Sequence, residues 1–225
     1  MGTHDGHRAR LKERFSRHGL DSFNEINALE LLLFYAIPRK DTNPIAHDLI
    51  NHFETLDNIF SASERELMEV PGIGESAAAL IRLVPAMYKK IQMSKTSEMT
   101  QINAFSDAAE YFIPRFLNEK DEVMMIMCLD VANRIVYTGE LNRGIVNAVD
   151  INSRAVAETA LKYKATSVIL AHNHPSGRAV PSKEDDFLTK NVSRSLKSLG
   201  IKLLDHIVIA GNDYFSMAMK GFMIY

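Results

Sequence analysis

Residues 166–175, Thr-Ser-Val-Ile-Leu-Ala-His-Asn-His-Pro, decide the fold of the carboxy-terminal half of the chain. Residues 166–171 contain the short apolar run Val-Ile-Leu-Ala and predict a buried β-strand. In an extended backbone, residues i and i+2 point to the same face, so His172 and His174 share one face where the strand ends. The two imidazoles can therefore meet a single ion.

Strands and helices alternate irregularly around this segment. The hydrophobic periodicity predicts helices over 106–117, 152–163 and 183–199 and strands over 122–129, 134–141, 203–210 and 214–217. A turn at residues 132–133 makes the first two strands a hairpin. This mixture predicts an α/β or α+β layered fold, with a mixed sheet and flanking helices, over residues 104–225.

The amino-terminal part has a different pattern. Helices are expected over 8–18, 26–36 and 44–53, and no strand alternation is visible there. Residues 89–103 are polar and lack sustained periodicity, which is typical of a connection. We therefore expect a small all-α helical domain at 1–90, a linker at 91–103 and the sheet domain after it.

Composition excludes several classes of protein. The 225 residues are 46% hydrophobic and 24% charged, as in a soluble globular protein, and the net charge of −2 gives no general attraction to polyanions. Cys128 is the only cysteine, which excludes disulfides and two-thiolate metal sites and favours a cytoplasmic location. The start of the chain lacks a signal core, and the longest strictly apolar runs, 31–37 and 123–129, are far shorter than the ~20 residues of a membrane span.

Two further residues complete a metal-binding pattern with the histidines. Ser182 follows His174 by eight residues and Asp185 by three more, at the predicted start of a helix. Two imidazoles and one carboxylate leave a fourth position for water, as in catalytic zinc sites. Chance gives the full spacing with a frequency of only about one in a thousand. Ser182 and Asp185 also fit a helix N-cap box, and both interpretations can hold together because a capping serine would aim the aspartate.

The spacing of His172, His174, Ser182 and Asp185 resembles the metalloprotease motif of JAMM (MPN) domains. Residues 172–177 and 204–209, His-Asn-His-Pro-Ser-Gly and Leu-Asp-His-Ile-Val-Ile, are similar to the bacterial RadC-like proteins within that superfamily, and the resemblance covers almost the whole chain. It implies a JAMM-type sheet and a Zn²⁺-dependent hydrolase of peptide or isopeptide bonds. The DNA-repair label of the RadC-like proteins also implies a link to DNA.

The JAMM pattern further implies an upstream glutamate that transfers the proton of the attacking water. We expect Glu140 in this role, with Glu122 or Glu158 as alternatives, and Glu140 can also be a simple solvated acid at a strand end. A Ser182 hydroxyl that points inward would donate to the developing oxyanion. His206, in a strand expected to be deep in the sheet, is either structural or orients a metal ligand from behind.

Residues 67–81 in the helical half, Leu-Met-Glu-Val-Pro-Gly-Ile-Gly-Glu-Ser-Ala-Ala-Ala-Leu-Ile, resemble a helix-hairpin-helix motif. Gly72 and Gly74 would allow a tight turn whose backbone N–H groups hold a DNA phosphate without reading sequence. Glu75 departs from the pattern, because its charge repels phosphate. Arg10 and Arg14 belong to a basic cluster on the first helix and are further candidates for non-specific DNA contacts, although the hairpin can equally be a packing module.

The sequence thus supports a zinc-dependent amide hydrolase first, with a protein or peptide substrate. The alternative is a DNA-repair or recombination accessory protein whose metal domain is non-catalytic or a nuclease. One fixed zinc with an open position suits amides better than the paired metals common for phosphodiesters. No membrane partner is expected, and the sequence is compatible with an oligomer.

Overall fold

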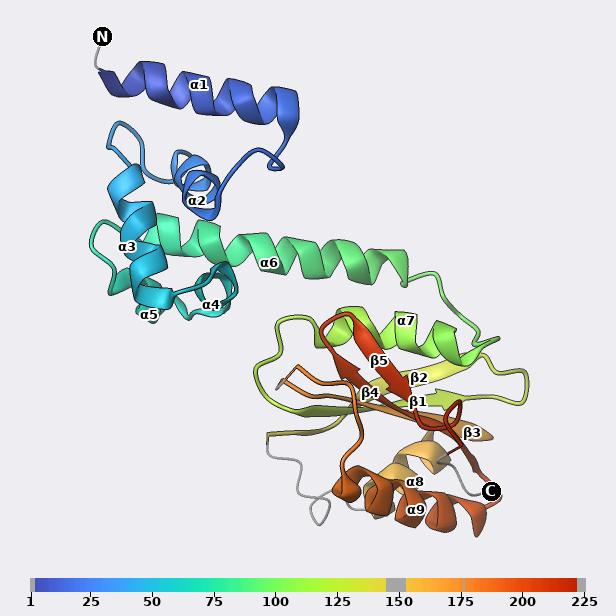
Figure 1. The fold of residues 1–225 in the computed structure, drawn as a ribbon. Helices are drawn as coiled ribbons and strands as arrows, with labels where there is room; N and C mark the ends of the chain where they lie inside the picture. Colours follow the sequence, from blue (N-terminus) through green and yellow to red (C-terminus); the bar gives the residue numbers. More distant parts are fainter. Residues whose placement is uncertain (1–2, 145–152, 176, 222–225) are drawn as a thin grey trace. The chain divides into compact units, whose positions relative to one another are not determined.

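The computed structural model describes residues 3–144, 153–175 and 177–221, and divides the chain into two compact units, 1–88 and 89–225. The first unit is helical (Figure 1). Its helices are α1 (Thr3–His18), α2 (Glu25–Leu33), α3 (Asn43–Phe53), α4 (Leu56–Ser61), α5 (Glu64–Met68) and the first two-thirds of α6 (Glu75–Lys95).

Local capping sets where several of these helices begin. Asn24 accepts a hydrogen bond from the N–H of Asn27 at the start of α2, and Ser63 forms a reciprocal capping box with Glu66 at the start of α5. Apolar side chains from α2 to α6 then form one core, whose fully buried members are Leu33, Ala46, Leu49, Ile59, Leu67, Ala78 and Ile81.

Helix α6 differs from the expectation for its second half. It continues to Lys95, so residues 91–95, which the sequence analysis assigned to a linker, are helical. The segment Ile-Gln-Met-Ser-Lys contains Gln, Met and Lys, which favour helix, and a polar composition alone does not stop a helix. Residues 96–103 are not helical; they include turns and one isolated bridge between Gln101 and Arg134.

The second unit contains a five-stranded mixed sheet in the order β2-β1-β3-β4-β5, which confirms the predicted α+β class (Figure 1). Its helices are α7 (Phe105–Phe116), α8 (Ser153–Lys162) and α9 (Lys183–Lys197), and its strands are β1 (Val123–Leu129), β2 (Ile135–Arg143), β3 (Ser167–Asn173), β4 (Lys202–Ala210) and β5 (Asp213–Ser216). Strands β3 and β4 are parallel, and the other neighbours are antiparallel.

A helix layer covers each face of this sheet. Side chains of β1 alternate between a core shared with α8 and α9, which includes Met124 and Ile126, and a core shared with α7, which includes Met127 and Leu129. Burial on both faces explains why β1 and β3 read as continuous apolar runs rather than as alternating ones.

Strand β3 extends two residues beyond its predicted end. Its parallel pairing with β4 continues through His172 opposite Val208 and Asn173 opposite Ile209. His172 is therefore fixed in the ladder of the sheet. Among the residues that the structure describes, no helix is long and apolar enough to cross a membrane.

Candidate metal centre

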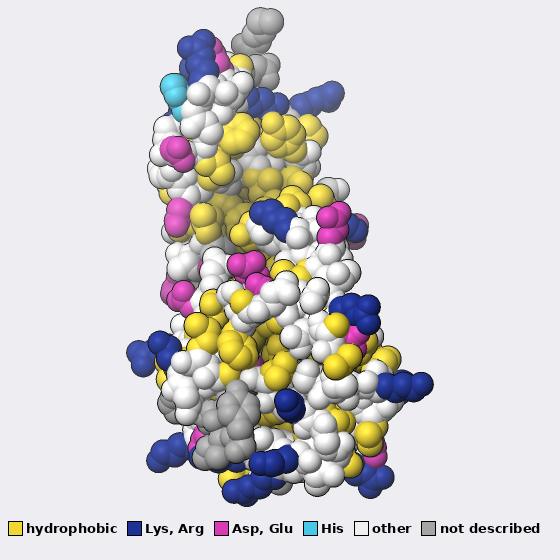
Figure 2. Space-filling model, turned by 90° about the vertical axis from the view of Figure 1, so that its right-hand side faces the viewer, with side chains coloured by type: hydrophobic (Ala, Val, Ile, Leu, Met, Phe, Trp, Pro, Cys, Tyr) yellow, Lys and Arg dark blue, Asp and Glu magenta, His cyan; other side chains and the backbone are white. Residues whose placement is uncertain are grey.

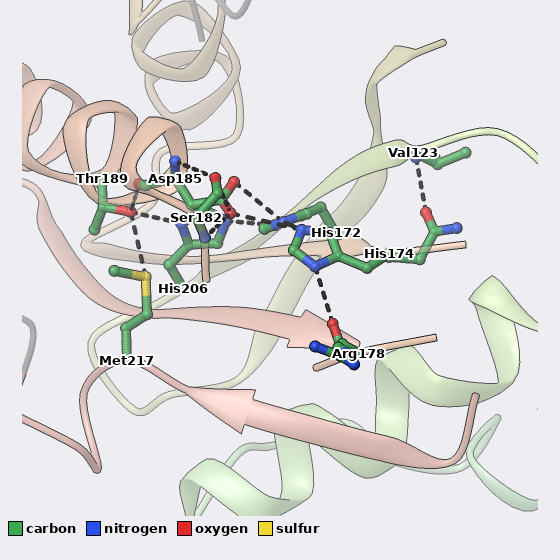
Figure 3. A network of polar contacts seen from close by, with 10 residues as sticks. Val123, His172, His174, Arg178, Ser182, Asp185, Thr189, His206 and Met217 are labelled. Carbon is green, nitrogen blue, oxygen red and sulfur yellow. Dashed lines mark hydrogen bonds and ion pairs between the residues drawn. The ribbon is translucent and has the colours of Figure 1, made fainter. Parts of the chain in front are cut away.

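The two histidines lie where β3 ends, on the face of the sheet that α9 covers. His172 is opposite Val208 in the β3–β4 ladder, and the N–H of His174 donates to the carbonyl of Ile209 at 2.7 Å. The side chain of His172 is 1% exposed and that of His174 is 15% exposed. Their rings meet with centroids 4.7 Å apart, as the alternation of the strand predicts (Figure 3).

Asp185 reaches the same point from the first turn of α9. Ser182 caps this helix: its hydroxyl accepts from the N–H of Asp185 at 3.1 Å and donates to Asp185 Oδ2 at 2.7 Å. The backbone N–H of Ser182 also donates to Asp185 Oδ2, at 2.7 Å. The capping box thus turns the carboxylate toward the histidines, and the only hydrogen of the Ser182 hydroxyl is used by Asp185.

The ligand atoms of His172, His174 and Asp185 converge. The two Nε2 atoms are 2.9 Å apart, and Asp185 Oδ1 and Oδ2 lie 3.2 Å from His172 Nε2 and 3.5 Å from His174 Nε2, respectively. A tetrahedral ion with bonds of about 2.0 Å separates its ligands by about 3.3 Å. Each of these separations is close to that length, with one carboxylate oxygen facing each imidazole, and one possible ligand atom from each residue can be chosen so that all three lie within 4.8 Å of one another.

The electrostatics of the cluster favour a cation. Burial opposes ionisation of Asp185, but its close contacts with His172, His174 and Ser182 outweigh it and hold the pKa of the carboxyl far below its usual range. The hydrogen bond with Asp185 raises the pKa of His174 against the effect of burial. A proton shared by these groups is what a metal ion would replace.

His206 lies directly behind His172. Its Nε2 is 2.9 Å from His172 Nδ1, its Nδ1 is 2.6 Å from Thr189 Oγ1, and its side chain is fully buried. Burial is the main cause that lowers the pKa of His206, to about 3. The structure therefore places this residue beside a candidate ligand, which is the position that the supporting role expected from the sequence requires.

Glu140, the expected proton-transfer residue, is not brought into this cluster. Its carboxylate binds Arg143, with Oε2 to Nη2 at 2.8 Å and Oε1 to Nε at 3.1 Å. In the β1–β2 register Glu140 is opposite Met125, which packs with the α7 core, so it faces away from His172. Glu158, one alternative, is exposed and pairs with Arg154 at 2.7 Å.

Glu122, the other alternative, is expected on the same face of the sheet as the cluster. It directly precedes β1 and is two residues before Met124, which is paired with His172 and packs in the α8–α9 core. Its carboxylate is close enough to contribute to the raised pKa of His174. Of the three glutamates expected as candidates, Glu122 is therefore the one whose charge acts on a candidate metal ligand.

The residues that the sequence analysis expected to contact DNA differ in their surroundings. Gly72 has φ +92° and its Cα packs against Ile45, where a Cβ would lie 2.8 Å from Cδ1, so this glycine is required by the turn. Gly74, just before α6, has open space around it. Arg14 is engaged within its own unit, donating to Ser22 Oγ at 3.1 Å and stacking over Phe23.

Arg10, the other predicted arginine, is exposed. On the face that Figure 2 shows, Lys and Arg side chains are spread among acidic and uncharged ones and form no continuous basic band. The arrangement therefore gives little support to a strong electrostatic DNA surface on that face.

Two polar residues that the sequence analysis did not assign to the site also support it. Thr189 connects α9 to His206, and its only sequence signal is its position one helical turn after Asp185. Asn173, between the two histidines, accepts from the N–H of Val123 at 2.7 Å and donates to the carbonyl of Asp121 at 3.0 Å. It thereby fixes the backbone on both sides of Glu122.

Two imidazoles and a carboxylate whose possible ligand atoms all lie within 4.8 Å of one another suit zinc or a similar divalent ion. Such an ion could polarise a carbonyl and activate water in a site that is largely shielded from solvent.

Comparison with known proteins gives matches to both units. Residues 102–222 match the model of the RadC-like JAB domain, and residues 43–84 match the model of a helix-hairpin-helix motif. A UPF0758 protein of Fusobacterium nucleatum subsp. nucleatum is 35% identical over 223 residues, which cover 96% of each chain.

Proposed function

The chain belongs to the RadC-like JAB domain family, and on this premise we propose that it is a zinc-dependent hydrolase of amide bonds in peptides or isopeptides. The observation that supports the proposal is the convergence of His172, His174 and Asp185, whose possible ligand atoms lie within 4.8 Å of one another. The single cysteine, which is buried, also agrees with a cytoplasmic protein.

The residues of the chain have distinct roles in this proposal. His172 Nε2, His174 Nε2 and one Asp185 carboxylate oxygen would hold the ion, and Ser182 keeps Asp185 in place. Zinc bound there would lower the pKa of a coordinated water to about 7 and polarise the amide carbonyl. The Glu122 carboxylate accepts the proton of the attacking water and donates it to the leaving amine.

This assignment changes two of the expected roles. Glu122 replaces Glu140, because Glu140 faces the other side of the sheet and is bound to Arg143. Ser182 orients a ligand through its capping box, and we do not assign it the oxyanion, since its hydroxyl hydrogen is directed to Asp185.

Metal analysis and activity together test the proposal. Protein purified without chelator should contain about one zinc per chain, and His172→Ala and Asp185→Ala should lose it. His18→Ala, which removes an exposed histidine on α1, is the matched control and should keep the metal. A panel of fluorogenic peptides and isopeptide-linked conjugates then measures turnover. A wild-type protein that is folded but takes up no zinc would contradict the proposal.

A second candidate function, DNA association through the first unit, is favoured by the helix-hairpin-helix match to residues 43–84. The turn between α5 and α6 contains Gly72 and Gly74 and presents the start of α6, while Glu75 weakens any attraction to phosphate. We propose this role as secondary to the metal centre.

Gly74 allows a clean test of DNA association, because a side chain there meets nothing within 4 Å. Gly74→Asp adds a negative charge where a phosphate would bind, and Gly74→Asn is its neutral control. Binding of a DNA duplex at low salt should weaken in Gly74→Asp and Arg10→Gln and strengthen in Glu75→Gln. Equal binding by all these variants, or none by the wild type, would remove the second candidate.

A further inference from the structure

A chain of buried polar groups connects the main chain of α9 to the far side of His172 (Figure 3). Thr189 Oγ1 is 2.5 Å from the carbonyl oxygen of Asp185 and 2.6 Å from His206 Nδ1. His206 Nε2 is 2.9 Å from His172 Nδ1. Thr189, His206 and His172 are each no more than 2% exposed, so water does not compete for these contacts.

The direction of the first hydrogen bond follows from the carbonyl. The Asp185 oxygen can only accept, so the single hydroxyl hydrogen of Thr189 is directed to it. The sulfur of Met217, 3.5 Å away, is a much weaker acceptor. With its hydrogen used, Thr189 Oγ1 can only accept from His206, and His206 Nδ1 must be the N–H that donates.

The next step follows from the burial of His206. Its two ring nitrogens contact neutral groups, Thr189 Oγ1 and His172 Nδ1, and the ring is not exposed to solvent. A neutral imidazole has one N–H, and here it is on Nδ1. Nε2 of His206 therefore carries a lone pair, and His172 Nδ1 must donate to it.

We infer that Thr189 and His206 are positioning residues that fix His172 in the tautomer with its hydrogen on Nδ1 and its Nε2 lone pair toward His174 and Asp185. The inference deepens the proposed function and rests on it for the identity of the ion. His206 is then a support for a ligand and not a fourth ligand, since its Nε2 is directed at His172 Nδ1.

A separate contact holds His174 in the same tautomer as His172. His174 Nδ1 lies 3.0 Å from the carbonyl oxygen of Arg178, which can only accept, so His174 also carries its hydrogen on Nδ1. Both Nε2 atoms and the Asp185 carboxylate then present lone pairs to one another at 2.9–3.5 Å. Three acceptors at this distance repel unless a cation or a proton lies between them.

Asp185 takes part at both ends of this chain of hydrogen bonds. Asp185 supplies the carbonyl that starts the chain of hydrogen bonds, and the carboxylate oxygen that faces His172 Nε2 at 3.2 Å, where the chain ends. Orientation of the imidazole and placement of the carboxylate therefore depend on the same turn of α9. A change at Thr189 should reach the metal ligands without any direct contact with them.

Two measurements test the inference. Ring-nitrogen NMR of the metal-free full chain at about pH 8 should show hydrogen on Nδ1 and a lone pair on Nε2 for both His206 and His172, because the two nitrogens have distinct shifts. Hydrogen on Nε2 of His206 would overturn the inference. This result does not depend on zinc uptake or on turnover.

The second measurement is zinc affinity, determined by competition with a chelator. Thr189→Val keeps the shape and removes the hydroxyl, and should weaken zinc binding by about 10- to 100-fold. Thr189→Ser restores the hydroxyl and should recover most of the affinity, which a purely packing role of the threonine would not produce. Thermal unfolding of both metal-free variants checks that they fold.

The outcomes separate the two proposals. Wild-type affinity in Thr189→Val, or equally weak binding in Thr189→Ser, would overturn the inference. A wild type that binds zinc with the expected tautomers but cleaves no amide would contradict the proposed function and support the inference.

Discussion

The side-chain amide of Asn173 accepts a hydrogen bond from the backbone N–H of Val123 at 2.7 Å. With its second contact, to the carbonyl of Asp121, it holds the backbone on either side of Glu122. Asn173 thus lies between His172 and His174 in the sequence, and its hydrogen bonds connect this segment to the backbone of Glu122, the proposed proton-transfer residue. Its side chain projects to the face of β3 opposite His172 and His174.

Asn173→Ala should therefore separate metal binding from turnover. Loss of the two buried hydrogen bonds should lower the free energy of unfolding by about 1–3 kcal/mol, and a misplaced Glu122 should lower kcat by about 10- to 100-fold. Zinc content should stay near that of the wild type. Asn51→Ala, which changes an exposed asparagine on α3, is the control. Unchanged kcat in a folded Asn173→Ala protein would argue against this role.

Glu122→Gln and Glu140→Gln form a matched pair of charge removals. Glu122→Gln should retain zinc and lose about 10²- to 10⁴-fold in kcat, because the amide cannot accept the proton of the attacking water. Glu140→Gln should keep most of the activity, since its carboxylate binds Arg143 on the other face of the sheet. Steady-state kinetics with metal content measured in parallel checks both, and the opposite ranking would restore Glu140 as the acid.

Ser182→Ala and Ser63→Ala remove the same capping interaction from two helices in different units. Each should lower the free energy of unfolding of its unit by about 1 kcal/mol. Only Ser182→Ala should weaken zinc binding, by about 10- to 100-fold, because only Ser182 holds a ligand. Urea denaturation and chelator competition measure the two effects. Equal zinc affinity in both variants would mean that Asp185 does not depend on its cap.

The buried His206 should make the stability of the metal-free protein fall in acid. Its pKa is lowered to about 3 in the folded protein, chiefly by burial, against about 6.5 when unfolded. Below pH 6.5 the unfolded state binds the additional proton, so the stabilisation present above that pH is progressively lost, by about 2 kcal/mol at pH 5.

His206→Gln provides the reference for this effect. The raised pKa of His174 acts in the opposite direction, with stability lost as pH rises, and is expected in both proteins. Urea denaturation with a chelator at about pH 7.5 and pH 5 should therefore show a smaller acid loss in His206→Gln than in the wild type. Equal losses would show that His206 becomes protonated in the folded state.

Local rules were sufficient for the core of the site. The period of two along β3 put His172 and His174 on one face, and the capping pattern at Ser182 put Asp185 in the first turn of α9. Both rules need only a few neighbouring residues. The structure brings these three candidate ligands together as the spacing predicts.

The parts of the site that the sequence did not predict depend on contacts between segments far apart in the chain. Asn142 is opposite Met124 and so lies on the face of the sheet that carries His172. Simple alternation would put Glu140, two residues earlier, on the same face. The register shift at Leu141 reverses this and turns Glu140 to the other face. The contact of Thr189 with His206 joins α9 to β4 and has no local pattern. The engagement of Arg14 by Ser22 likewise depends on how the chain returns after α1.

The two faces of strand β3 have different roles, one in the metal-binding cluster and one in holding the backbone beside Glu122. The length of this strand therefore cannot change freely. His172 faces the cluster and Asn173 faces Val123, and both positions are fixed by pairing with β1 and β4. Deletion of a single residue between Ser167 and His172 would exchange the two faces for every residue that follows. An amide would then replace the first imidazole, so that one lost codon in this strand should abolish the site more completely than many substitutions.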